Sequence, residues 1–149
     1  MRDLPGCVST KFRRRKTLTG VTPSNKGRYD VTNMSKYLVL YRSEGALTGP
    51  SVSEMMAKTA PEQLAAGMGV WRAWHEKCGG AIIDLGAPLD HSTTVAGGTG
   101  TPGKTSITGY TLLEAGSLYE AVTLMKGHPH FHAPGASVQI LECIAMPGM

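Results

Sequence analysis

The order of the apolar segments constrains this chain more than any other feature of its sequence. From residue 37 to residue 144, short apolar runs typical of strands alternate with longer stretches in which apolar residues recur at helical spacing. The resulting order is strand, helix, strand, strand, helix, strand. We therefore expect one α+β domain in which an antiparallel sheet carries its helices on one face.

Four segments have the composition of strands. Residues 37–41 are aromatic and branched and are bounded by Lys36 and Arg42, which is typical of a buried strand. Residues 81–85 are a second predicted strand, and residues 106–113, where apolar residues alternate with polar ones, are a third. The last strand is expected to start near Ala136 and to continue to about residue 144.

Both long helices are predicted from an apolar stripe and its end signals. The first stripe ends at a Gly-Gly pair and contains Leu64, Met68, Trp71, Trp74, His75 and Cys78. The second ends at Gly127 and contains Leu118, Ala121, Val122 and Met125. Capping boxes, in which a hydroxyl caps early amides and a Glu reaches back, are predicted at residues 51–54, 59–62 and 117–120. Together with the strands, these helices predict the ferredoxin-like βαββαβ fold.

The first 33 residues differ in composition from the rest. They carry eight Lys or Arg and two Asp, whereas residues 34–149 carry seven Lys or Arg and nine Asp or Glu. We expect residues 1–33 to be a disordered basic extension, either an arm or a stretch upstream of the true start at Met34, and residues 34–149 to be the domain. A chain that starts at Met34 should keep its thermal midpoint within ~5 °C of the full chain.

Charge, hydropathy and cysteine content exclude several classes of function. Because the basic excess lies outside the domain, we expect no nucleic-acid binding. No run of about 18 apolar residues could span a membrane, and the N-terminus lacks the apolar segment of a secretory signal. We therefore expect a cytoplasmic protein without a membrane partner. Cys7, Cys78 and Cys143 are widely spaced and are expected to be reduced structural thiols rather than zinc ligands.

Residues 98–105 match the phosphate-binding pattern G-x-x-x-x-G-K-[ST]. That loop binds phosphate because a helix follows it and directs unpaired amide groups at the ligand. Here a predicted strand follows instead. We therefore interpret residues 98–105 as a Gly-rich hairpin connection and not as a nucleotide site.

Three of the five histidines lie within five consecutive positions, between the second helix and the last strand. Such a short connection holds its side chains near the end of the sheet, and histidine can both accept and donate protons near neutral pH. His128 and His130 are therefore the candidate catalytic residues. The candidate pocket residues are His75 and Trp71, whose alternative role is in the core, and Asp84, whose alternative place is on the solvent side.

From Ser35 onward the sequence resembles the YCII-related, or DGPF-domain, family of small dimeric α+β barrels. The similar stretches are 34–40 (Met-Ser-Lys-Tyr-Leu-Val-Leu), 71–74 (Trp-Arg-Ala-Trp), 109–110 (Gly-Tyr), 127–131 (Gly-His-Pro-His-Phe) and 135–140 (Gly-Ala-Ser-Val-Gln-Ile). The resemblance implies a homodimer with a small-molecule pocket between sheet and helices. For some members it also implies a His and Asp pair that performs acid/base chemistry.

This chain departs from the family at that pair. No His occupies the expected helix position, near Gly67, and His75 lies two turns later. The Asp that precedes Pro in relatives is His128 here, and a Gly-rich hairpin replaces the Asp-Gly-Pro-Phe motif. The fold, the dimer and the position of the pocket can therefore be transferred as expectations, whereas the mechanism cannot.

Three functions follow from these residues. The first is an acid/base enzyme, of isomerase or lyase type, with His128 or His130 as general base; His128→Ala should then slow turnover and leave the fold intact. The second is a non-catalytic ligand-binding or accessory dimer. The third is a metal site formed by His128, His130 and His132 on one face of an extended segment. We predict no cofactor and assign no residue as a metal ligand; the metal site is kept only as a further alternative.

Overall fold

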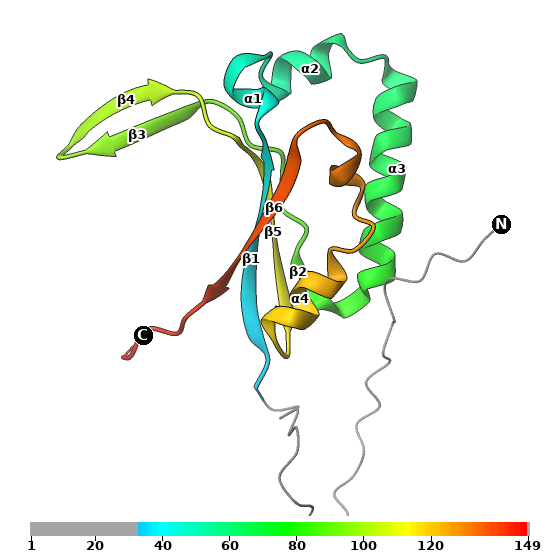
Figure 1. Ribbon diagram of the computed structural model, residues 1–149, viewed down its shortest axis with the longest axis vertical. Helices are drawn as coiled ribbons and strands as arrows, with labels where there is room; N and C mark the ends of the chain where they lie inside the picture. Colours follow the sequence, from blue (N-terminus) through cyan, green and yellow to red (C-terminus); the bar gives the residue numbers. More distant parts are fainter. Residues whose placement is uncertain (1–32, 149) are drawn as a thin grey trace, which may run out of the picture.

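The computed structural model describes residues 33–148, so the predictions for residues 1–32 and Met149 lie outside the described part of the chain. The fold is α+β, with a four-stranded antiparallel sheet of order β2-β5-β1-β6 (Figure 1). Its strands are β1 (Ser35–Ser43), β2 (Ile82–Asp84), β5 (Ile107–Ala115) and β6 (Ala136–Cys143). The predicted α+β class, with an antiparallel sheet and helices, is confirmed, and two strands that were not predicted, β3 (Ser92–Ala96) and β4 (Thr99–Gly103), lie between β2 and β5. Within one chain, the sheet does not close into a barrel.

Two long connections carry the helices. Between β1 and β2 lie α1 (Gly45–Thr48), α2 (Val52–Lys58), α3 (Pro61–Cys78) and the 3-10 turn η1 (Gly79–Ala81). Between β5 and β6 lie α4 (Leu118–Leu124) and the 3-10 helix η2 (Pro129–His132). Figure 1 shows α3 and α4 on the same side of the sheet.

The capping predictions are right at two helices and wrong at one. Ser51 and Glu54 form the complete capping box of α2, and the Ser117 hydroxyl accepts from the Glu120 amide at the start of α4. The N-cap of α3 is Ala60, which has no side-chain cap. The Thr59 hydroxyl donates instead to the Met55 carbonyl of the preceding helix, at 2.7 Å.

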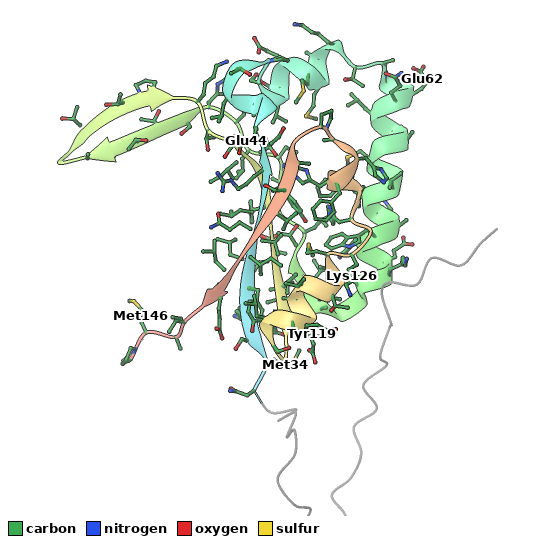
Figure 2. All side chains as sticks on the ribbon, viewed as in Figure 1. Met34, Glu44, Glu62, Tyr119, Lys126 and Met146 are labelled. Carbon is green, nitrogen blue, oxygen red and sulfur yellow. The ribbon has the colours of Figure 1, made fainter. Side chains whose placement is uncertain are left out.

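The core lies between the sheet and the C-terminal half of α3. Its buried apolar residues are Tyr37, Val39, Tyr41, Trp74, Cys78, Leu113, Ala115, Ala121 and Met125. The predicted stripe of α3 packs only in that half, since Met68 is 61% exposed. Figure 2 shows Glu62, at the other end of α3, standing clear of the sheet. The first turns of α3 therefore lie beyond the end of the strands they were expected to cover.

A two-stranded ribbon replaces the predicted hairpin loop. It consists of β3 (Ser92–Ala96) and β4 (Thr99–Gly103), joined by Gly97 and Gly98, which both have positive φ. Two consecutive residues of positive φ form the turn that matches the twist of a tight hairpin, which explains the Gly-Gly pair. In Figure 1 the ribbon leaves the sheet on the side opposite α3.

Gly86 fixes the chain where it leaves β2. Its φ is +77°, and a Cβ at this position would lie 1.8 Å from the Tyr110 carbonyl oxygen on β5. Any larger residue would therefore have to separate the backbone from β5, which makes glycine a steric requirement here. Leu85, the residue before it, contacts the candidate site.

Candidate functional site

The histidine segment is shaped by a turn and a helix cap. After α4, Gly127 adopts φ +72° and reverses the chain, and Pro129 then starts η2. His128 is the N-cap of η2, and its Nδ1 accepts a hydrogen bond from the His130 amide at 3.0 Å. An N-cap side chain normally supplies such an acceptor to the first amides of a helix. One ring nitrogen of His128 is thus used to hold the local backbone.

The other ring nitrogen of His128 belongs to a buried hydrogen-bond chain. Since Nδ1 is an acceptor, the neutral ring carries its proton on Nε2, which lies 3.2 Å from the Tyr41 hydroxyl. Tyr41 then donates to Thr111 Oγ1 at 2.8 Å, and Thr111 donates to the Leu85 carbonyl at 2.8 Å. Each polar side-chain atom in this series of hydrogen bonds therefore has a partner. The donors point from His128 through Tyr41 and Thr111 to the Leu85 carbonyl.

The His128 side chain is 0% exposed, and three aromatic rings pack against its imidazole. The Tyr41 ring stacks on it at 4.9 Å between centroids, and the Trp74 and Trp71 rings meet it edge-on at 4.3 and 4.6 Å. We call Tyr41, Trp71, Trp74 and His128 the aromatic cage. Burial, with a smaller contribution from nearby His130, lowers the pKa of His128 to about 3. His128 is therefore a neutral core residue at physiological pH.

Tyr41 is equally constrained. Burial is the main cause that raises the pKa of its phenol to about 12, opposed by the hydrogen bond with Thr111. The hydroxyl is therefore protonated whenever the protein is folded near neutral pH. The hydrogen-bond chain thus carries no charge at either titratable member.

His130 connects η2 to the ends of two strands. Its Nε2 lies 2.9 Å from the Arg42 carbonyl of β1 and 3.1 Å from the Ser137 carbonyl of β6. Both partners are acceptors, so Nε2 carries the proton and donates to them. These hydrogen bonds tie η2 to β1 and β6, and they direct Nε2 to the backbone rather than to a substrate.

The predicted metal arrangement is wrong. Residues 129–132 form a 3-10 helix instead of an extended segment, so the histidines do not share one face. His128 is buried, His130 Nε2 bonds to carbonyls, and His132 is exposed. Between residues 33 and 148, no group of three or more His, Cys, Asp or Glu is placed to hold a metal ion.

The structure brings together some of the predicted site residues and separates others. Trp71 contacts His128, and His130 lies 5.2 Å from the Tyr41 ring. Asp84 is exposed and accepts instead from the Tyr110 hydroxyl, at 3.1 Å, and from the Gly86 amide. His75 is partly exposed on α3 and takes no part in the ring contacts of the cage.

Sequence reasoning missed the role of Tyr41 and Thr111. Both were assigned to strands without a polar role, yet they complete the chain that starts at His128. They lie 70 residues apart in sequence. One available signal was Thr111, a hydroxyl residue in the predicted strand directly before Leu112 and Leu113, since a buried hydroxyl requires a partner.

An apolar groove lies beside the histidine segment. Its volume is about 380 Å³, and we call it the α4–β6 groove. It is lined by Leu118, Val122, Met125, Lys126, Phe131, Val138 and Ile140. Lys126 is the one charged residue of this lining and lies two residues beyond the end of α4 (Figure 2). Phe131 connects the groove to the cage, because its ring centroid lies 6.5 Å from that of His128.

A smaller, more polar hollow of about 160 Å³ lies at the base of the ribbon. Gly103, Lys104 and Thr105, the end of the phosphate-binding pattern, form part of its wall. No helix follows them, because β5 starts at Ile107. The Lys104 ammonium donates to the Gly49 carbonyl at 3.1 Å. The start of α2 also lines the hollow, but its Ser53 amide donates to Asp90 at 3.0 Å and its Glu54 amide to the Ser51 hydroxyl at 3.2 Å. These amides are therefore not free to bind a phosphate, as a nucleotide site requires.

We predict that this hollow binds no nucleotide. Titration of the protein with ATP and magnesium, followed by calorimetry, should give no saturable heat up to millimolar concentration, because the first amides of α2 are already bonded to Asp90 and Ser51 and no helix follows Lys104. Micromolar binding that Lys104→Ala abolishes would contradict this interpretation. Lys58→Ala, which removes a cation from the end of α2, serves as the matched control.

Comparisons with known proteins do not indicate a function for the site. No protein-family model matches the chain, and no curated protein matches it in sequence. In the part of the chain that the structure describes, no helix has the length and apolar character needed to cross a bilayer.

Proposed function

We propose that this protein is a non-catalytic small-molecule-binding protein that takes an apolar carboxylate in the α4–β6 groove. The observation that carries the proposal is the groove itself, which is apolar, lies beside the histidine segment and has a single cation in its lining. Its volume of about 380 Å³ falls within the range of roughly 300–1,000 Å³ typical of small-molecule sites. Lys126 would pair with the carboxylate while the apolar lining receives the rest of the ligand.

The state of His128 favours binding over proton transfer. A general base needs a ring nitrogen within hydrogen-bond reach of the substrate. Nδ1 of His128 is held by the His130 amide and Nε2 by Tyr41, and the ring is enclosed. An acid/base enzyme with His128 as its base would have to break this arrangement, so the second of the three predicted functions is the one we adopt.

A pair of matched probes tests the groove. We expect 1-naphthoate to bind and its uncharged amide to bind somewhat more weakly, as measured by calorimetry. Lys126→Glu should weaken the binding of naphthoate about tenfold, because it removes one ion pair and adds a repulsion between like charges. The affinity for the amide should stay unchanged. Val122→Glu, which places a charge in the apolar lining, should weaken both probes.

The control for Val122→Glu is Tyr119→Glu on the same helix, because Tyr119 is 75% exposed and is not part of the lining. If naphthoate fails to bind, or binds equally to wild type and Val122→Glu, the groove is not the ligand site.

We further propose that the protein is a homodimer of the YCII-related type and that the open face of the sheet is its interface. The strand order β2-β5-β1-β6 with antiparallel neighbours supports the ferredoxin-like arrangement that this family implies. Residues 37–41 of β1 are apolar without alternation, a pattern of strands that are covered on both faces. Tyr37, Val39 and Tyr41 face the helices, so Leu38 and Leu40 face the other way.

That open face continues across neighbouring strands. Leu38 pairs with Leu112 on one side and Leu141 on the other, and Leu40 pairs with Tyr110. Leu141 is 41% exposed, and Figure 1 shows no helix on this side of the sheet. A second copy that presents the same face would cover these side chains, as symmetric interfaces require.

The oligomeric state tests this second part. We expect sedimentation velocity to give a dimer for the wild type and a monomer for Leu40→Arg, because an arginine there places a charge at the centre of the interface. Tyr119→Arg, on the helix side, should remain dimeric. A wild type that sediments as a monomer at all concentrations would contradict the homodimer and leave the groove proposal unaffected.

A further inference from the structure

The β3–β4 ribbon is anchored at its base and extends away from the rest of the chain. At the base, the Leu89 amide donates to the Thr108 carbonyl at 2.9 Å, and Lys104 donates to the Gly49 carbonyl. All residues from Thr93 to Lys104 are exposed. The anchored base sets the direction of the ribbon, and its outer part is covered by no other part of residues 33–148.

The two faces of the ribbon differ in chemistry. The strand pairing places Thr94 opposite Thr101 and Val95 opposite Gly100. Since alternate residues point to opposite faces, one face carries the hydroxyls of Ser92, Thr94, Thr99 and Thr101. The other face carries Val95, Pro102 and the Thr93 side chain, whose methyl carbon packs over Gly100. Val95, at the centre of this apolar face, is 69% exposed.

Such a ribbon is not expected to be ordered on its own. A two-stranded hairpin without further packing is marginally stable at best in water. No charged residue lies between His91 and Lys104, although charges are a common means of keeping exposed strand edges from pairing. The composition of the ribbon therefore indicates contact with another surface rather than with solvent.

The direction and length of the ribbon identify that surface. Figure 1 shows that it leaves the sheet on the side opposite α3, the side of the open face. Five strand residues span about 17 Å at ~3.4 Å per residue, whereas two packed sheets are separated by about 10 Å. A ribbon of this length exceeds the separation, so it reaches past the plane of any sheet that packs on the open face.

We propose that the β3–β4 ribbon is a clasp that packs its apolar face, centred on Val95, against a second copy of this chain docked on the open face of the sheet. The inference rests on the homodimer proposed above and adds to it an element that lies outside the sheet. By symmetry, each copy contributes one ribbon and receives one.

A matched pair of neighbouring substitutions tests the clasp. Val95→Lys and Thr94→Lys introduce the same charge at adjacent ribbon positions on opposite faces. We expect Val95→Lys to raise the dimer dissociation constant at least ~10-fold, as for a central interface residue, and Thr94→Lys to raise it less than ~3-fold. Both constants are measured by sedimentation equilibrium on the full chain.

Hydrogen exchange provides a second measurement that needs no substitution in the ribbon. Ribbon amides should exchange at least ~10-fold more slowly in the wild-type dimer than in the Leu40→Arg monomer, because only the dimer packs the ribbon. Amides at the C-terminal end of α3, which packs on the opposite face of the sheet, serve as the internal reference for global stability.

The outcomes separate the two proposals. If the wild type is a dimer, but Val95→Lys and Thr94→Lys have equal effects or the ribbon amides exchange equally in dimer and monomer, the clasp is overturned and the homodimer stands. If the wild type is a monomer throughout, the homodimer is overturned and the clasp with it.

Discussion

Replacing His128 with alanine is expected to destabilise the protein by about 3–5 kcal/mol. The substitution opens a cavity among the Tyr41, Trp71 and Trp74 rings, and loss of a large core side chain costs roughly this much. It also removes the acceptor of the His130 amide and the donor to the Tyr41 hydroxyl, each of which costs about 1–3 kcal/mol when buried. This result would differ from the sequence-based expectation that His128→Ala leaves the fold intact.

Urea unfolding measures the effect. His128→Asn should recover about 1 kcal/mol of the loss, since an Asn side chain can cap the His130 amide but cannot fill the cage. His132→Ala, at an exposed position of η2, should change the free energy of unfolding by less than about 0.5 kcal/mol. If the free energy of unfolding of His128→Ala lay within about 0.5 kcal/mol of wild type, as for a surface substitution, the cage would not support the fold.

Acidification from pH 7 to pH 4 should cost about 3 kcal/mol of stability through His128 alone. The folded pKa of His128 is about 3, whereas an unfolded histidine titrates near 6.5. Between these values the unfolded chain binds a proton that the folded protein excludes. Stability is therefore fully present above pH 6.5 and falls by up to ~1.4 kcal/mol per pH unit as the pH decreases toward 3.

Comparing wild type with His128→Asn isolates this effect, with both proteins unfolded in urea at each pH. One protein concentration is used throughout, because dimerisation would make stability depend on concentration. The variant should start lower at pH 7 and lose about 3 kcal/mol less between pH 7 and pH 4. Parallel pH profiles for the two proteins would show that His128 titrates normally and is accessible to water.

The main elements could be read from local sequence signals because each is defined by neighbouring residues. The strands around residues 37–41 and 106–113 are predicted by composition, and the helix start at Ser117 by a hydroxyl and a glutamate three residues apart. The residues that define each of these elements lie within a few positions of one another in the sequence, so no contact with a distant residue is needed to predict them. The same holds for the rejection of a phosphate loop, since the strand that follows Lys104 is a local pattern.

The capping prediction at Thr59 failed because the sequence pattern does not show which of two partners the hydroxyl chooses. The pattern there was correct, but the Thr59 hydroxyl had a competing partner in the Met55 carbonyl, one turn back in the preceding helix. The apolar stripe of α3 likewise did not show how much of the helix packs on the sheet. The helix extends past the ends of the strands, so Met68 has no sheet to pack against.

The sequence alone thus determined the four strands of the sheet, the two long helices and the concentration of histidines before the last strand, because each follows from residues close to one another in the chain. The role of those histidines was decided by tertiary structure. His128 meets Tyr41 from a strand 87 positions earlier, and Thr111 and Leu85 continue the same chain of hydrogen bonds. Burial and these distant partners, which no local pattern encodes, convert a candidate base into a neutral residue of the core.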